Sequence, residues 1–298
     1  RSELKTGQLK SLVLHEVLIL TFTYPLPRTL KQHPDEVHTV PISPNLSFGE
    51  GSPILIAGPC TLESYEHTVS SALTVKEAGA QVFRGSIRKP RTSPFSFQGW
   101  EKECVLWHKE AQSIHGLPTE TEVLDVRDVE ITAEHVDILR IGAKNMHNTP
   151  LLQEVSKSHR PIILKRSPAA TLEEWLCAAE YILASSPSCP GVILCERGIR
   201  TFEHSTRYTL DLNTVALLKE ISSLPVIVDP SHAAGKRSLV LPLASAGLSV
   251  GADGLMIEVH AHPEKALCDA KQQITPEELH LFAKKHFCPS ESRAHAIS

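Results

Sequence analysis

The stretch "ILIAGPC", residues 54–60, decides the fold that we predict for this chain. Its four apolar residues, Ile54 to Ala57, form a run that is typical of a strand buried on both faces. Gly58 and Pro59 then end the run, because these residue types favour turns. Cys60 follows at once, so the sequence places a thiol at the tip of a buried strand.

Seven further apolar runs follow the first one along the chain. They lie in 81–87, 117–123, 137–144, 161–167, 191–197, 225–231 and 254–260. Amphipathic stretches separate them, such as 65–80 and 171–186, and a last helix is predicted in 274–287 with Thr275 as its N-cap and Pro276 at its first position. Eight strand–helix units predict an α/β fold of the (β/α)8 TIM-barrel type. A doubly wound open sheet is the alternative, but no GxGxxG motif follows the first strand.

The two ends of the chain do not belong to these strand–helix units. Residues 1–50 include a segment rich in Pro, Ser and Gly, which predicts a short N-terminal extension in the form of a hairpin or irregular cap. We expect the catalytic barrel to occupy 51–288 and a C-terminal tail to occupy 289–298.

Composition narrows the class of protein. The chain has 298 residues, 41% of them hydrophobic, and a net charge of −4, which gives no general reason to expect nucleic acid or an anionic membrane as a partner. No apolar run is long enough to span a bilayer. The seven cysteines are odd in number and lack CxxC spacing, so a disulfide framework is not indicated. A reducing compartment, the cytoplasm, is therefore predicted.

Reactive or charged side chains stand at the ends of the predicted strands, where a barrel would bring them to one mouth. They are Cys60, Arg84, Glu122, Lys144, Lys165, Arg166, Arg197, His232 and Glu258. A single cysteine at a strand end is more often a small core residue. A thiolate, an imidazole and a carboxylate together instead favour a divalent metal, for which Asp269 is a candidate fourth ligand. The cations, with Arg91, predict an anionic partner such as a phosphate, because buried charges are costly when unpaired.

Several longer motifs resemble those of 3-deoxy-D-arabino-heptulosonate 7-phosphate (DAHP) synthases, over about residues 30–285. They are "AGPCTLES", "RGSIRKPRTSPFSFQG", "LPTETEVLDVRDVE", "RIGAKNMHN", "ILCERGIRTFE", "TRYTLDL", "LPVIVDPSHAAGKR" and "GADGLMIEVHAHPEKALCDAKQQ". The chain is most similar to the subgroup that also resembles 3-deoxy-D-manno-octulosonate 8-phosphate synthases. The resemblance implies a transferase that condenses phosphoenolpyruvate with erythrose 4-phosphate and releases phosphate, at the first step of the shikimate pathway.

The resemblance also implies roles for individual residues. Cys60, His232, Glu258 and Asp269 fall on metal ligands, for Mn, Fe, Co or Zn. Lys89, Arg84, Lys165 and Arg197 fall on groups that hold phosphoenolpyruvate, and Arg91 and Thr92 on the clamp for erythrose 4-phosphate. Lys89, Glu122 and His232 are the expected catalytic residues, with Glu122 orienting water. A homo-oligomer, a dimer or tetramer, is also expected.

Three positions depart from the family pattern. Lys144 stands where an arginine usually meets the phosphate, and Ser86 and Ser167 replace glycines. The front end is also shorter than the regulatory or mutase domains of some relatives, so we expect neither a fused chorismate mutase nor an aromatic amino acid sensor.

Three alternatives remain open at this stage. One is a synthase that uses arabinose 5-phosphate, although "KPRTSP" differs from the "KANRS" typical of those enzymes. A second is a non-catalytic barrel that binds phosphorylated metabolites. The third is a lyase-type metal aldolase, which would not need so many anion-binding cations.

Overall fold

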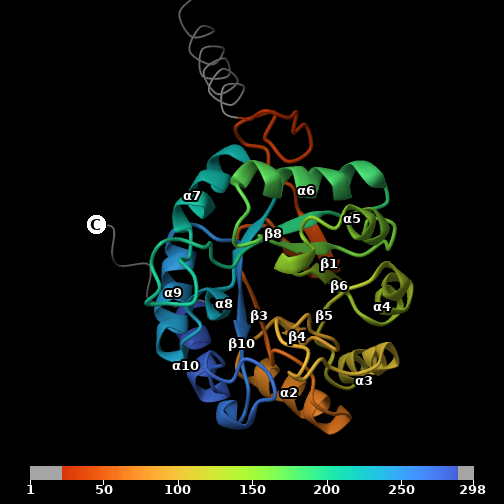
Figure 1. Ribbon diagram of the computed structural model, residues 1–298, viewed down its shortest axis with the longest axis vertical. Helices are drawn as coiled ribbons and strands as arrows, with labels where there is room; N and C mark the ends of the chain where they lie inside the picture. Colours follow the sequence, from red (N-terminus) through yellow and green to blue (C-terminus); the bar gives the residue numbers. More distant parts are fainter. Residues whose placement is uncertain (1–21, 288–298) are drawn as a thin grey trace, which may run out of the picture.

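Eight parallel strands form a closed barrel in the computed structural model, which describes residues 22–287 (Figure 1). The strands are β3 (Ile54–Gly58), β4 (Val82–Arg84), β5 (Thr119–Glu122), β6 (Ile138–Ile141), β7 (Ile162–Lys165), β8 (Val192–Glu196), β9 (Val226–Val228) and β10 (Gly254–Glu258). Each lies within one of the eight predicted runs. Neighbours in sequence pair in parallel, and β10 pairs with β3 to close the ring. The predicted TIM barrel is confirmed.

Helices follow the strands and cover the outside of the barrel (Figure 1). They are α2 (Tyr65–Glu77), α3 (Leu106–His115), α4 (Val129–His135), α5 (Thr149–Val155), α6 (Leu172–Ser185), α7 (Leu212–Ile221), α8 (Pro230–Ala234), α9 (Arg237–Ser249) and α10 (Pro276–His286), with short 3₁₀ turns at Lys102–Val105, Val126–Asp128, Ala143–Asn145 and Pro263–Lys265. Thr275 caps α10 through a capping box with Glu278, and Pro276 begins the helix, as predicted. None of the helices within 22–287 has the length and apolar character that a membrane crossing requires.

The strands separate two hydrophobic layers because their side chains alternate between the two faces. Ile54 and Ile56 of β3 belong to a cluster inside the barrel, whereas Leu55 and Ala57 belong to the cluster between sheet and helices. A strand buried on both faces favours apolar residues at successive positions, which explains the continuous apolar run of β3.

An antiparallel hairpin precedes the barrel, formed by β1 (Val40–Ser43) and β2 (Leu46–Phe48). Val40 and Phe48 are buried and join the cluster inside the barrel. They lie against Gly191 and Gly254, which precede β8 and begin β10, so the hairpin covers the amino end of the barrel. The predicted N-terminal cap is thus a hairpin. The domain limits at 50 and 288 stay predictions, and residues 1–21 and the tail 289–298 lie outside the described part of the chain.

Candidate active site

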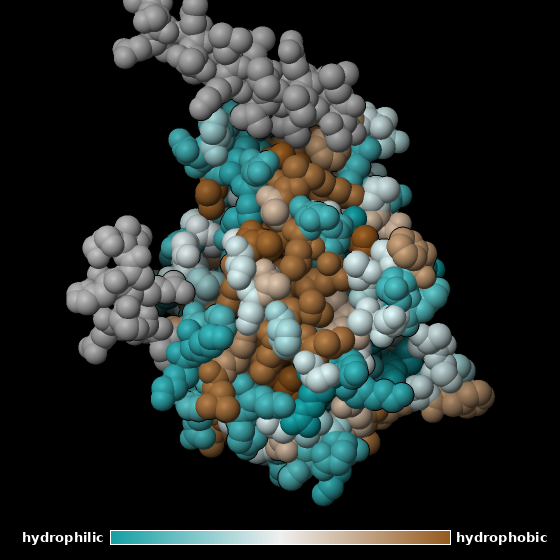
Figure 2. Space-filling model, turned by 90° about the vertical axis from the view of Figure 1, so that its left-hand side faces the viewer, coloured by the Kyte–Doolittle hydropathy of each residue, from teal (hydrophilic) through white to brown (hydrophobic). Residues whose placement is uncertain are grey.

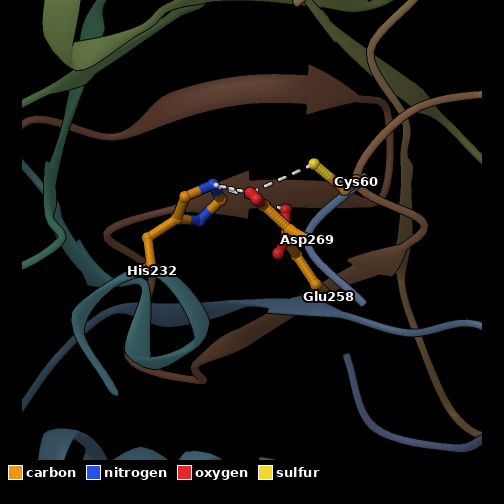
Figure 3. Close-up of side chains that lie close together, drawn as sticks. All are labelled: Cys60, His232, Glu258 and Asp269. Atoms are coloured by element: carbon orange, nitrogen blue, oxygen red, sulfur yellow. Dashed lines mark hydrogen bonds and ion pairs between the residues drawn. The ribbon is translucent and has the colours of Figure 1, made fainter. Parts of the chain in front are cut away.

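Four side chains that the sequence proposed as metal ligands meet at the carboxyl mouth of the barrel (Figure 3). Cys60, His232, Glu258 and Asp269 each offer an atom, and these atoms all lie within 4.8 Å of one another. Nε2 of His232 is 3.4 Å from Oε1 of Glu258 and 3.7 Å from Oδ2 of Asp269. Sγ of Cys60 lies 3.5 Å from the same Asp269 oxygen. The four residues form a candidate metal site.

Cys60 reaches this position through the turn at Gly58. Gly58 has a φ of 151°, and a Cβ there would lie 2.1 Å from the carbonyl oxygen of Arg84 on the next strand. A side chain at this position would therefore force β3 and β4 apart. The chain leaves β3 closely packed against β4, and the turn directs the buried thiol of Cys60 to the other ligands.

His232 is oriented by the segment "VDPSHAAG". Asp229 caps the single turn of α8, and its Oδ1 accepts a hydrogen bond of 2.9 Å from the backbone N–H of His232. Its Oδ2 lies 2.7 Å from Nδ1 of the same imidazole, so Nε2 is the nitrogen that faces Glu258 and Asp269. A metal-binding histidine commonly has a carboxylate at its second nitrogen. Burial lowers the pKa of His232 well below its usual value, which keeps the ring neutral and its lone pair free.

Asp269 and Glu258 are positioned by neighbouring polar groups. Asp269 adopts a left-handed backbone with a φ of 51°, which aspartate tolerates better than most residues. Burial opposes its ionisation, but the charges of Lys89 and Arg207 outweigh it and lower the pKa of Asp269. Gln272 donates through Nε2 to Oε2 of Glu258 at 2.5 Å and to Oδ2 of Asp269 at 3.4 Å. Both carboxylates are therefore held in place.

The chemistry of these donors fits a divalent cation. Burial raises the pKa of Cys60 well above its usual range, and contacts with Cys268 and Glu258 raise it further. A thiolate at this site therefore requires a compensating cation. One thiolate, one imidazole and two carboxylates form the mixed set that suits Mn, Fe, Co or Zn.

A cavity opens beside the candidate metal site and shares His232 and Asp269 with it. Its lining residues are Lys89, Pro90, Glu122, Arg140, Gly142, Ala143, Lys144, Lys165, Arg197, Arg207, His232 and Asp269. Six of these side chains are lysine or arginine, so the cavity is suited to anions.

Arg197 is the clearest candidate for anion binding in this cavity. It is buried, its guanidinium lies 4.5 Å from the ring centre of Tyr208, and its Nη1 has no hydrogen-bond partner in the described structure. A buried donor without a partner is rare and costly. A phosphate or carboxylate in the cavity would supply the missing acceptor.

Three of the strand-end cations already have a carboxylate of the protein as a partner. Arg84 is fully buried and pairs with Glu258 at 3.2 Å, and Lys165 pairs with Asp229. Arg166 pairs with Glu196 at 3.2 Å and Asp211 at 2.9 Å, and does not line the cavity. The protein's own carboxylates offset the desolvation of these charges. Lys165 still lines the cavity, whereas Arg84 lies beside the candidate metal ligand Glu258.

The remaining predicted residues lie at the cavity or near it. Lys89 lines it, and its Nζ is 3.9 Å from Oε2 of Glu122, another lining residue. Lys144 is an exposed lining residue, and its Nζ donates to the carbonyl oxygen of Pro90 at 2.9 Å. Arg91 is partly exposed and contacts Cys268, and Thr92 is exposed; neither lines the cavity. The substrate roles of these residues stay predictions.

Arg140 is a lining residue that the sequence reasoning missed. It is almost fully buried in β6 and donates to Glu120 at 2.5 Å, Glu122 at 3.1 Å and the hydroxyl of Ser86 at 2.8 Å. Burial opposes ionisation of Glu122, but Arg140 and then Lys89 lower its pKa. The sequence does contain a sign of this residue, because Arg140 is a charged side chain inside the apolar run "DILRIG" of a predicted buried strand. Asp229 and Arg207 were missed as well.

Comparison with known proteins identifies the family. Residues 32–288 match the DAHP synthetase I family. The chain is a member of this family. The prediction drawn from the long motifs is therefore confirmed.

The chain can be compared with individual relatives by sequence identity and by structure. It is 44% identical to the phospho-2-dehydro-3-deoxyheptonate aldolase of Thermotoga maritima, over 81% of this chain and 70% of that protein. A crystal structure of that enzyme, with 40% identity, has a TM-score of 0.81 and covers 88% of this chain and 77% of the other. The chain is 31% identical to the 2-dehydro-3-deoxyphosphooctonate aldolase of Syntrophotalea carbinolica, over 81% of this chain and 92% of that protein.

Proposed function

We propose that this protein condenses phosphoenolpyruvate with erythrose 4-phosphate to give DAHP and inorganic phosphate. The observation that carries the proposal is the juxtaposition of the Cys60, His232, Glu258 and Asp269 cluster with a cavity lined by six cationic side chains. Membership of the DAHP synthetase I family and 44% identity to a phospho-2-dehydro-3-deoxyheptonate aldolase support the same reaction.

The reaction needs an enol carbon to attack an aldehyde and water to add to the carbon that bears the phosphate. A divalent ion held by the four ligands supplies Lewis acidity toward the aldehyde oxygen. Arg197 and Lys165 hold the carboxylate and phosphate of phosphoenolpyruvate, while Lys89 offers a further cation beside them. Glu122, kept ionised by Arg140 and Lys89, accepts a hydrogen bond from the attacking water.

The proposed test is an assay of the purified protein with phosphoenolpyruvate and either sugar phosphate. We expect turnover with erythrose 4-phosphate, loss of turnover after chelation, and recovery when Mn, Fe, Co or Zn is added back. Cys60→Ala should reduce turnover by at least about a hundredfold, because it removes a ligand of the proposed Lewis acid. Cys195→Ala, at a buried thiol inside the barrel, is the matched control. Full activity in metal-free protein would contradict the proposal.

A synthase that uses arabinose 5-phosphate is the second candidate. Its support is the 31% identity to a 2-dehydro-3-deoxyphosphooctonate aldolase. Equal or better efficiency with arabinose 5-phosphate in the same assay would favour this candidate. Arg91 and Thr92, which we propose as the erythrose 4-phosphate clamp, favour the first one.

We also propose that the protein forms a homo-oligomer in a reducing cytoplasm. Figure 2 shows the face on the side of α7, α9 and α10, where apolar residues gather in a band. Leu217 of α7 is 42% exposed, Leu281 of α10 is 69% exposed, and Leu241 of α9 is partly buried. An exposed apolar band of this kind often marks an interface. Sedimentation velocity measures the assembly, and a monomer at micromolar concentration would contradict it.

A further inference from the structure

Two thiols lie against each other next to the candidate metal site. Sγ of Cys60 is 3.0 Å from Sγ of Cys268, although the two residues are 208 positions apart in the chain. Both side chains are buried, Cys60 at 0% and Cys268 at 2% exposure. The separation exceeds the length of a disulfide bond, about 2.05 Å, by only about 1 Å. A small movement of either side chain would therefore bring the sulfurs to bonding distance.

Only one of these thiols belongs to the candidate metal site. The cluster contains Cys60 but not Cys268. On its other side, Cys268 contacts the guanidinium of Arg91, the residue proposed to hold the sugar phosphate. The second thiol thus lies between a metal ligand and a substrate-binding group, and the four-ligand mechanism does not use it.

No other described cysteine has such a partner. Cys104, Cys177, Cys189 and Cys195 are free, and within residues 22–287 none of them is hydrogen-bonded to another sulfur. The cavity comes close to the Cys60 pair, because Asp269 lines the cavity and its Oδ2 lies 3.5 Å from Sγ of Cys60. A small oxidant in the cavity is therefore one side chain away from the pair.

We propose that Cys60 and Cys268 form a reversible oxidation site, at which a peroxide joins them in a disulfide. One sulfur attacks a peroxide oxygen, the O–O bond breaks, and a sulfenic acid and one water form when hydrogen peroxide is the oxidant. The other thiol then attacks the sulfenic sulfur, the S–S bond forms, and a second water leaves. Two thiols and one hydrogen peroxide thus give one disulfide and two waters.

The disulfide removes Cys60 from the set of metal ligands. This consequence rests on the proposed metal-dependent function, whereas the bond itself does not. A protein that contains the disulfide keeps His232, Glu258 and Asp269 but loses its thiolate, the softest of the four donors. Metal binding and oxidation therefore compete for the same sulfur.

The experiment starts from full-length, metal-free protein treated with a small excess of hydrogen peroxide. After free thiols are blocked, digestion without reductant and mass spectrometry should find a peptide that links Cys60 to Cys268. Titration with Co2+, followed by the visible absorption of the bound cobalt, should show an affinity at least about tenfold weaker than in untreated protein, restored after reduction with dithiothreitol. Cys268→Ser should lose the link, whereas Cys195→Ser should keep it.

The rate at which the link forms in protein loaded with Zn2+ before oxidation distinguishes the proposed oxidation site from the proposed ligand role of Cys60. Slower formation of the link supports both the oxidation site and the ligand role of Cys60. Equally fast formation supports the oxidation site and contradicts the ligand role. The oxidation site itself is overturned if both thiols remain free for blocking after treatment, or if Cys60 links to a different cysteine.

Discussion

Asp229 contacts two side chains of the candidate site at once. It pairs with Lys165 and lies 2.7 Å from Nδ1 of His232. Burial opposes its ionisation, but the contact with the His232 imidazole and the charge of Lys165 outweigh it and lower the pKa of Asp229 well below its usual range. One charge thus fixes a candidate metal ligand on one side and a cavity cation on the other.

Asp229→Asn should weaken metal binding by about 10- to 100-fold, because the amide no longer provides the charge that orients the imidazole. Titration of metal-free protein with Co2+ measures the affinity. Asp253→Asn is the control, because Asp253 pairs with Lys219 just before β10 begins, away from the mouth. Equal affinities in the two variants would show that Asp229 does not act through His232.

Lys144→Arg tests the departure from the family pattern at the rim of the cavity. A guanidinium restores a forked pair of charge-assisted hydrogen bonds to a phosphate, and we expect a gain of about 1 kcal/mol. The Michaelis constant for phosphoenolpyruvate should fall several-fold, and the constant for the sugar phosphate should barely change. Lys157→Arg, at an exposed ion pair with Glu154, is the control for steady-state kinetics. A raised constant would mean that the pocket has adapted to lysine.

The candidate ligands could be predicted from the sequence, but their supporting residues could not. Cys60, His232 and Glu258 stand at or just after strand ends, and a barrel brings strand ends together whatever the details of packing. Asp229 pairs with Lys165 across 64 positions, and Arg140 reaches Ser86 across 54. Such pairings depend on side-chain direction inside the barrel, which periodicity does not reveal.

At the scale of elements, the end of β6 shows how a strand and its neighbour share one space. A Cβ at Gly142 would lie 1.9 Å from Oε1 of Glu122, which ends β5. The carboxylate therefore occupies the space that any other residue at 142 would fill. Arg140, two residues earlier on the same segment, donates to that carboxylate from β6.

Gly142→Ala should displace Glu122 and lower kcat by about tenfold or more, because the carboxylate that we propose to orient water loses its position. Gly116→Ala is the control: Gly116 ends α3 with a φ of 69°, and nothing lies within 4 Å of the added Cβ. That variant should lose stability but keep its kcat. Steady-state kinetics and thermal unfolding of both proteins distinguish the two effects, and an unchanged kcat in Gly142→Ala would contradict the role of Glu122.

Most of the eight strands could be predicted because a strand buried on both faces favours a continuous apolar run, and this requirement is local. Strand β5 is the exception, because its four buried residues, Thr119–Glu122, are all polar. Helices α6 and α10 were predicted for similar reasons, the second from its Thr275 cap. The single turn of α8 was not predicted, since five residues are too few for a helical period to appear. Its position depends instead on the Asp229 cap, which became apparent only when His232 was placed.

At the scale of the whole molecule, one buried histidine links stability to pH. His108 of α3 is fully buried, and its Nε2 lies 2.8 Å from the carbonyl oxygen of Gly85. Burial lowers the pKa of His108 from 6.5 to about 4. The unfolded chain therefore binds a proton below pH 6.5 that the folded protein accepts only near pH 4, so stability falls through this window.

The free energy of unfolding should fall by about 2.5 kcal/mol between pH 7.5 and 4.5 on account of this residue. Urea unfolding of the wild type and of His108→Gln at both pH values measures the difference. Between these pH values, the free energy of unfolding of the variant should fall by about 2.5 kcal/mol less than that of the wild type. His115→Gln, on the same helix and also bonded to a carbonyl oxygen, is the control because it is only partly buried. Identical pH profiles in all three proteins would contradict the assignment.

The hairpin β1–β2 at the amino end limits how reactants enter the barrel and how products leave it. Val40 and Phe48 close that end with buried hydrocarbon, and the cavity opens at the opposite end. Both reactants must then enter, and both products must leave, through the mouth of this one cavity. Whichever reactant sits deeper has to enter first, and the fragment left behind in its place has to leave last. We therefore expect the protein to bind its two reactants in a fixed order.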